Sequence, residues 1–192
     1  QDRIRQQKGL GQSFLVAEKV TPSLLQAARL SPQDTILEIG PGIGTLTTEL
    51  AQRAKQVIAV EKDAKMVQFL TTSLKETKNV EIIHEDALKQ ALPSAPYKVV
   101  ANLPYYITAP MIRTLLEAEN PPESIIIIVQ KEVGQRICVK PPRMNMLAIS
   151  VQLYATPTLV TTIKKGAFWP QPQVDSAILK LESIHKPNID IS

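Results

Sequence analysis

Two hydrophobic patterns alternate along the chain. Short continuous apolar runs, each about as long as one strand, are typical of strands buried on both faces of a parallel sheet. The stretches between them place apolar residues three or four positions apart, as helices with one buried face do. Strands are predicted over residues 34–39, 56–61, 80–83, 97–101, 124–130, 158–163 and 174–181, and helices over residues 18–30, 45–51, 64–74, 108–118, 132–138 and 144–154. This order predicts one doubly wound α/β domain whose last two strands form an antiparallel pair.

Four side chains have predicted roles in these helices. Asp63 and Thr108 stand at helix starts, where a side-chain oxygen can accept a hydrogen bond from a free backbone N–H group. Met144 and Met146 are flexible apolar side chains and are predicted to fill gaps in the core.

The first long strand ends in a glycine-rich turn. Residues 40–44 read Gly-Pro-Gly-Ile-Gly, and glycine lets the backbone turn sharply and approach a ligand closely. The dinucleotide fingerprint needs a third glycine where this chain has Thr45, and no Lys-Ser or Lys-Thr pair follows, so neither common phosphate loop is present. Glu38 would repel a pyrophosphate but suits a cationic ligand, such as S-adenosylmethionine with its sulfonium and ammonium groups. Taken alone, the glycines also fit a tight turn that binds no ligand.

Carboxylates follow the next two strands. Glu61 lies roughly 20 residues beyond the glycine turn, where α/β nucleotide folds place an acid that binds ribose hydroxyls. Asp86 follows the strand at 80–83 and can accept a hydrogen bond from the exocyclic amine of adenine. The carboxyl ends of parallel strands meet at one edge of a sheet, so the turn and both acids are expected to form one ligand site.

The strand at 97–101 leads into Asn102, Leu103, Pro104 and Tyr105, the most specific chemical signal in the chain. An amino group on a base is a poor nucleophile because its lone pair is delocalised into the ring. The Asn102 side-chain oxygen and a nearby backbone carbonyl can accept both N–H hydrogens, while Pro104 fixes the turn and Tyr105 stacks on a flipped-out base. By itself the tetrapeptide also fits a strand-ending turn with a buried tyrosine.

An aromatic pair precedes the last strand. Phe168 and Trp169 are followed by prolines at positions 170 and 172, which stiffen the segment. The pair is suited to stack on a base, and it fits equally well as a hydrophobic plug.

Composition places few further limits on function. The 192 residues are 44% hydrophobic and 21% charged, which are ordinary values for one globular domain. The net charge of +4 permits an acidic partner such as RNA, and basic residues concentrate in the first eight residues and in 131–143, where they are equally suited to solvate exposed loops. The single cysteine, Cys138, excludes an internal disulfide and a cysteine metal site, so a reducing compartment and no metal are expected.

Membrane and targeting signals are absent from the sequence. The longest apolar run, residues 125–129, is far too short to span a bilayer, and no signal-peptide pattern opens the chain. A soluble, cytoplasmic protein is expected.

With these motifs assembled, the chain resembles the ribosomal RNA adenine N6,N6-dimethyltransferase family. The motifs that carry the resemblance span nearly the whole chain: residues 11–15, 38–42, 102–105 and 168–176. The resemblance implies a class I S-adenosylmethionine-dependent methyltransferase fold, Rossmann-like, with a seven-stranded, mostly parallel sheet and an antiparallel last strand. It also implies dimethylation of two adjacent adenosines near the 3′ end of small-subunit rRNA, in ribosome biogenesis, by a monomer.

The resemblance further implies roles for individual residues. Asn102, Leu103, Pro104 and Tyr105 would be catalytic, and Tyr105 and Phe168 would hold the target adenine. The cofactor would be contacted by Ser13, Leu15, Gly40, Glu61, Asp86 and Asn102. Residues 1–17 would form a basic arm and a loop that closes over the cofactor.

Two departures from the family pattern stand out. Ser13 occupies a position where Asn or His is more common, and the chain ends where family members continue into a small helical domain, so residues 1–192 are expected to be the catalytic domain alone. Two other functions stay open. One is a large-subunit rRNA adenine methyltransferase of the macrolide-resistance type, although Leu103 favours the small-subunit enzymes. The other is a non-catalytic RNA-binding or transcription-accessory relative.

Overall fold

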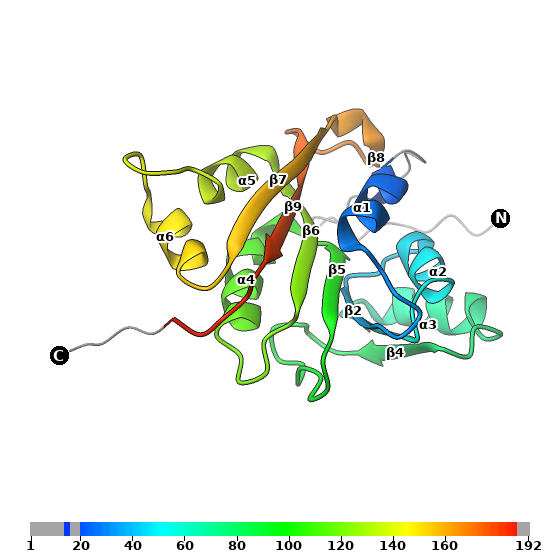
Figure 1. The fold of residues 1–192 in the computed structure, drawn as a ribbon. Coiled ribbons are helices and arrows are strands. Elements are labelled where there is room, and N and C mark those ends of the chain that lie inside the picture. Colours follow the sequence, from blue (N-terminus) through cyan, green and yellow to red (C-terminus); the bar gives the residue numbers. More distant parts are fainter. Residues whose placement is uncertain (1–13, 16–19, 188–192) are drawn as a thin grey trace.

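The computed structural model describes residues 14–15 and 20–187 (Figure 1). Its strands are β1 (Phe14–Leu15), β2 (Thr35–Ile39), β3 (Gln56–Glu61), β4 (Val80–His84), β5 (Lys98–Asn102), β6 (Ser124–Gln130), β7 (Thr156–Ile163), β8 (Phe168–Trp169) and β9 (Ser176–Glu182). Its α-helices are α1 (Val20–Ala28), α2 (Thr45–Ala51), α3 (Ala64–Ser73), α4 (Thr108–Leu116), α5 (Lys131–Ile137) and α6 (Met146–Gln152). Two short 3-10 helices, η1 (Tyr105–Ile107) and η2 (Lys165–Ala167), complete the described elements. The predicted strands and helices are therefore confirmed, with small shifts at their ends.

Seven of these strands form one mixed sheet in the order β4-β3-β2-β5-β6-β9-β7. The strands from β4 to β6 run parallel, and β9 runs antiparallel to both β6 and β7. This arrangement confirms the predicted α/β fold with an antiparallel last strand. The carboxyl ends of β2, β3, β4 and β5 consequently lie side by side at one edge.

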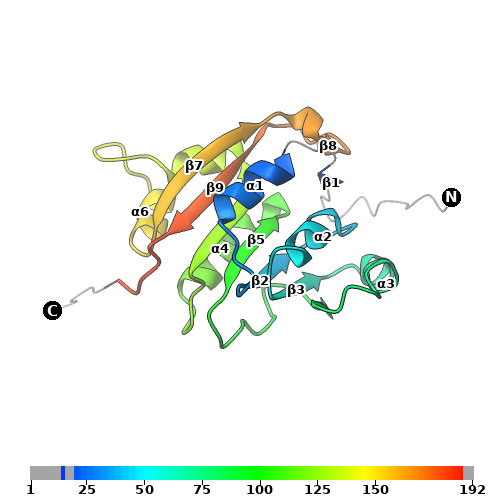
Figure 2. The same ribbon diagram turned by 45° about the vertical axis from the view of Figure 1, so that its right-hand side comes forward.

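Helices cover both faces of the sheet (Figures 1 and 2). Alternation along β6 shows the layering, because Ile125, Ile127 and Val129 belong to the cluster under α4, α5 and α6. Ile126 and Ile128 belong to the other cluster, under α1 and α2. All five side chains are completely buried, and each contributes about 1.5–3 kcal/mol of hydrophobic stabilisation. The continuous apolar run is thus explained by a central strand with two buried faces.

A separate two-stranded sheet joins two distant parts of the chain. β1 pairs antiparallel with β8, with Phe14 opposite Trp169 and Leu15 opposite Phe168. The pairing places residues 14–15 directly beside the aromatic segment that precedes β9.

Of the side-chain roles predicted for the helices, one is confirmed and two are wrong. Asp63 caps α3, since its carboxylate accepts a hydrogen bond from the Lys65 N–H group at 2.8 Å. Thr108 does not cap α4, because η1 runs directly into the helix and Thr108 already has helical dihedral angles. Met146 is 79% exposed instead of filling the core, because α6 turns Ala148 and Val151 inward.

Candidate functional site

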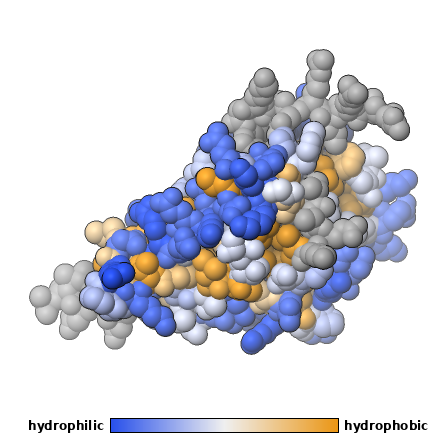
Figure 3. Space-filling view, turned by 90° about the horizontal axis from the view of Figure 1, so that it is seen from above, coloured by the Kyte–Doolittle hydropathy of each residue, from blue (hydrophilic) through white to orange (hydrophobic). Residues whose placement is uncertain are grey.

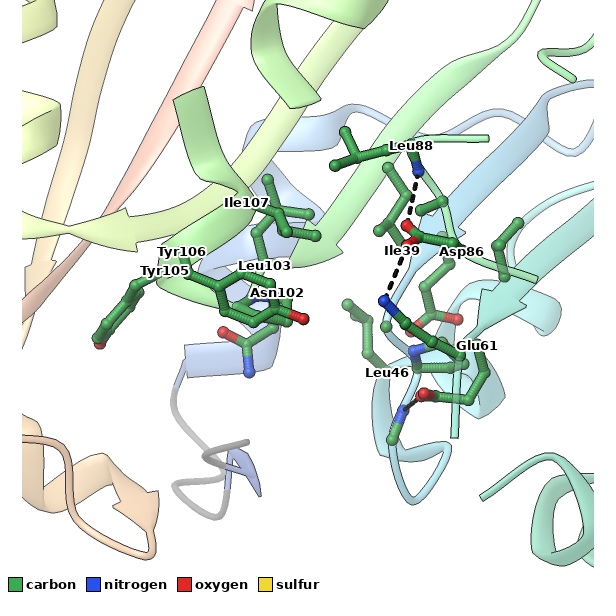
Figure 4. Close-up of a pocket in the computed structure, with 18 of the residues that line it drawn as sticks. Ile39, Leu46, Glu61, Asp86, Leu88, Asn102, Leu103, Tyr105, Tyr106 and Ile107 are labelled. Carbon is green, nitrogen blue, oxygen red and sulfur yellow. Dashed lines mark hydrogen bonds and ion pairs between the residues drawn. The ribbon is translucent and has the colours of Figure 1, made fainter. Parts of the chain in front are cut away.

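A pocket opens at the carboxyl ends of the parallel strands. The segments after β2, β3, β4 and β5 line it, together with Phe168 of β8. Figure 4 shows Asn102, Tyr105 and Tyr106 on one side and Glu61 and Asp86 on the other. From above, along the strand ends, hydrophobic residues form a band across the middle of the face with hydrophilic residues at its borders (Figure 3). The strand-end residues predicted to form one site are therefore brought together.

The glycine turn requires glycine for conformational reasons. Gly40 and Gly44 have φ angles of 68° and 81°, in the left-handed region that other residues rarely adopt. The Gly40 N–H group donates to the Val60 carbonyl at 2.9 Å, which holds the turn against β3. A Cβ atom on Gly40 would lie 3.6 Å from Cδ of Pro104 and 3.9 Å from the Asn102 carbonyl oxygen. The glycine turn and the Asn102–Tyr105 segment thus form adjoining walls of the pocket.

Glu38 lines the pocket but is almost completely buried, with 1% of its surface exposed. Burial raises the pKa of its carboxyl group to about 8; the proximity of Thr47 opposes the rise, and the charge of Glu61 adds to it. Its Oε2 atom is buried and has no hydrogen-bond partner among the described residues. At neutral pH Glu38 is mostly a neutral acid. The charge repulsion expected of Glu38 from the sequence therefore applies only above about pH 8 or beside a cation that lowers its pKa.

Glu61 is a buried acid that braces the glycine turn. One carboxylate oxygen accepts from the Gly42 N–H group at 3.2 Å, and the other accepts from the Asp63 N–H group at 2.9 Å. Burial raises the pKa of Glu61, while these backbone donors oppose the rise. Each oxygen keeps a second lone pair, so the carboxylate can still accept hydrogen bonds from ligand hydroxyl groups.

Asp86 forms an ion pair at the pocket rim that sequence reasoning missed. Lys62 Nζ lies 2.8 Å from one Asp86 oxygen, and the other oxygen accepts from the Leu88 N–H group at 3.1 Å. The hydrogen bond from Lys62 lowers the pKa of Asp86, which keeps this carboxylate ionised. A lysine directly after the strand-ending Glu61 was the available signal.

The aromatic residues divide between the core and the solvent. Phe168 is 4% exposed, belongs to the core cluster under α1 and α2, and also lines the pocket. Trp169 is 61% exposed. The aromatic pair therefore splits, with Phe168 serving as a buried plug that also forms part of the pocket wall.

Tyr105 and Tyr106 line the same wall, with their rings pointing in opposite directions (Figure 4). Tyr105 is half-buried, and its hydroxyl oxygen lies 2.7 Å from the hydroxyl oxygen of Ser176 on β9. Tyr106 is 59% exposed. The bond between Tyr105 and Ser176 was not anticipated from the sequence.

The N-terminal cofactor predictions have less structural support. Ser13 and the basic residues of the predicted arm lie outside the described residues. Leu15 is described through its backbone, which pairs with Phe168.

The described residues contain neither a cluster that could hold a metal ion nor a helix that could span a membrane. No group of three or more His, Cys, Asp or Glu side chains among them is placed to hold a metal ion. Within the same part of the chain, every helix is too short or too polar to cross a membrane.

Sequence comparisons point to one family. A profile of the family described as "Ribosomal RNA adenine dimethylase" matches residues 3–192. A "Ribosomal RNA small subunit methyltransferase A" from Dehalococcoides mccartyi is 48% identical over 183 residues, which are 93% of this chain and 63% of that relative. The chain thus spans slightly less than two thirds of the relative's length.

Solved structures show the same fold. A dimethyladenosine transferase from Plasmodium falciparum superposes with a TM-score of 0.82 at 30% identity, over 88% of this chain and 62% of that one. The 23S rRNA methyltransferase ErmE superposes with a TM-score of 0.84 at 31% identity, over 92% of this chain and 72% of that one.

Proposed function

Because this chain belongs to the ribosomal RNA adenine dimethylase family, we propose that it is the catalytic part of a small-subunit rRNA dimethyltransferase. It transfers methyl groups from S-adenosylmethionine to N6 of two adjacent adenosines near the 3′ end of that RNA, giving dimethyladenosine. The observation that carries the proposal is the contact between the glycine turn and the Asn102–Tyr105 segment in one pocket. The proposed partner is the small ribosomal subunit or its precursor. We propose that the protein binds it in the cytoplasm and as a monomer.

The charges of the pocket support S-adenosylmethionine as the cofactor. Four acidic residues line the pocket, and Lys62 at its rim is paired with one of them, Asp86. The four are Glu38, which is mostly neutral at neutral pH, and Glu61, Glu85 and Asp86. Such a lining disfavours a phosphate and suits a ligand that brings amines, hydroxyls and a positive charge. The buried Oε2 atom of Glu38, which has no hydrogen-bond partner among the described residues, is one polar atom left for such a ligand.

Individual residues would hold different parts of this cofactor. Glu61 would accept from the ribose hydroxyls and Asp86 from the adenine amine, while Gly40 and Asn102 would contact the cofactor where the two walls meet. Ser13 and Leu15 would close over it from the N-terminal segment. When bound, S-adenosylmethionine would supply an electrophilic methyl group on its sulfonium.

Asn102 is proposed to activate the acceptor base. Its side-chain oxygen and a neighbouring backbone carbonyl accept the two amine hydrogens and restore lone-pair density to N6. Pro104 and Leu103 hold the turn, while Tyr105 and Phe168 flank the flipped-out adenine. The positively charged amine formed by methylation is acidic, so its proton leaves to solvent. Neither histidine, His84 or His185, belongs to the pocket lining, so no histidine is assigned as a base. The positioning of the two substrates supplies most of the rate enhancement.

Two alternatives keep some support. The similarity to ErmE is as strong in shape as the similarity to the dimethyladenosine transferase, so the fold does not separate large-subunit from small-subunit substrates. The 48% identity to a small subunit methyltransferase and the presence of Leu103 favour the small subunit. A non-catalytic relative would not need an intact Asn102 beside the glycine turn.

The test compares two asparagine variants. Asn102→Ala should slow methyl transfer about a hundredfold or more, because it removes an acceptor aimed at the reacting amine. Its unfolding midpoint should stay close to that of the wild type. Asn120→Ala is the matched control: Asn120 donates to the Pro93 carbonyl at 2.9 Å, and neither residue lines the pocket. Near-normal turnover by Asn102→Ala would refute the assigned role.

A further inference from the structure

The geometry points to Ser176 as a positioning residue that sets the orientation of the Tyr105 ring. The two hydroxyl oxygens lie 2.7 Å apart, although the residues are 71 positions apart in the chain. This inference rests on the proposed function, because it concerns the wall against which the acceptor adenine is held.

Ser176 is buried on an apolar face. Its side chain is fully buried, and the alternation along β9 places it on the same face as Ile178, in the layer that contains Phe168. Burying a hydroxyl group among apolar side chains is costly unless it forms a hydrogen bond. Tyr105 provides that bond, which gives the serine a specific reason to stand at this position.

The backbone around Ser176 is fixed on several sides. Ser176 pairs with Gln130 of β6 and with Ile163 of β7. The preceding Asp175 accepts from the Lys131 N–H group through its carbonyl and from the Lys165 N–H group through its carboxylate, both at 3.0 Å. The Ser176 hydroxyl is therefore a well-placed anchor.

The hydrogen bond to Ser176 orients the Tyr105 side chain. Its backbone is set by the turn after Pro104, and its ring can otherwise rotate about two side-chain torsions. The hydroxyl oxygen lies on the axis of the second torsion, so a hydrogen bond at the far end of the ring restricts the first torsion, which sets the direction in which the ring points. Tyr105 lines the pocket, so its ring is then held in a constant position at the pocket wall. This matters most for the second methylation, when a bulkier base must be accommodated.

A set of matched variants tests this role. Ser176→Ala and Tyr105→Phe each remove the bond while keeping the strand and the ring. Tyr97→Phe is the control, because Tyr97 is also buried and donates through its hydroxyl to the Asn120 carbonyl at 3.3 Å, outside the pocket. The 192-residue chain is assayed in single turnover on undermethylated small subunits, with mono- and dimethyladenosine counted separately.

We expect Ser176→Ala to slow transfer about tenfold and to raise the share of monomethyladenosine, with cofactor affinity within about twofold of the wild type. Tyr105→Phe should behave alike, and the double variant should be no slower than either single one. Tyr97→Phe should keep the wild-type product ratio even where its unfolding midpoint falls.

Two outcomes separate the inference from the proposed function. If the wild type is active and Ser176→Ala matches Tyr97→Phe in rate and product ratio, the function stands and the positioning role is overturned. If the wild type transfers no methyl group to small subunits, the proposed function itself fails. Additive losses in the double variant would also overturn the positioning role, because they would show that the two hydroxyls act separately.

Discussion

Replacing Glu38 with glutamine should make the folded protein more stable at alkaline pH. The carboxyl group is 1% exposed, and burial raises its pKa from 4.5 to about 8. In the unfolded chain this group loses its proton near pH 4.5, whereas in the folded chain it keeps the proton until about pH 8. Between these values the folded state binds the extra proton, so the wild-type stability falls as the pH rises.

The size of the effect follows from the pKa shift. One unit of pKa corresponds to about 1.4 kcal/mol, so the loss relative to a permanently neutral side chain is about 3 kcal/mol at pH 7 and about 4 kcal/mol at pH 8. Glutamine has nearly the same shape and cannot ionise. The two proteins should therefore be equally stable, within about 1 kcal/mol, at pH 5.

Urea unfolding of the wild type and Glu38→Gln, without cofactor, measures this difference at about pH 5, 6, 7 and 8. Subtracting the two curves removes the contribution of every other titrating group. The glutamine variant should gain an advantage that grows with pH. Parallel curves, with a constant difference across this range, would show that Glu38 is ionised in the folded protein and that burial does not keep it neutral.

Three further results are expected. Gly44→Ala should lower the free energy of unfolding by about 1–3 kcal/mol in urea titrations, because the residue has φ +81° and the new Cβ atom would lie 2.7 Å from Leu70. Gly166→Ala, where no described residue comes within 4 Å of the added atom, should change it by less than about 0.5 kcal/mol, and equal losses in the two variants would contradict this reading of the glycine turn. Asp86→Asn should weaken S-adenosylmethionine binding about tenfold in calorimetric titrations, because the change leaves Lys62 unpaired at the rim and replaces a carboxylate acceptor. An unchanged affinity would show that Asp86 does not bind the cofactor.

The sheet was predictable because its central strands, β2, β5 and β6, are buried on both faces. Runs such as residues 125–129 have only one good explanation in a chain of this length, and alternation with helical stretches fixes a parallel arrangement. Glu61, Asp86 and Asn102 were then placed together by topology alone, since they follow strands that end at one edge.

Features that depend on burial and on distant pairing were out of reach. The sequence shows Glu38 as a carboxylate, but its neutral state follows from its burial between the sheet and α2. The bond between Tyr105 and Ser176 joins residues that no local pattern relates. Thr108 failed as a cap because a 3-10 turn extends the helix backwards, and local sequence does not reveal that extension.

The modified nucleoside itself distinguishes a small-subunit dimethyltransferase from the other candidate functions. Undermethylated small ribosomal subunits and naked large-subunit RNA are incubated separately with the protein and labelled S-adenosylmethionine, and the products are identified by mass spectrometry. We expect dimethyladenosine at two adjacent positions near the 3′ end of the small-subunit RNA and none in the large-subunit RNA. Methylation of the large-subunit RNA alone, or no transfer to either RNA while S-adenosylmethionine still binds, would contradict this expectation.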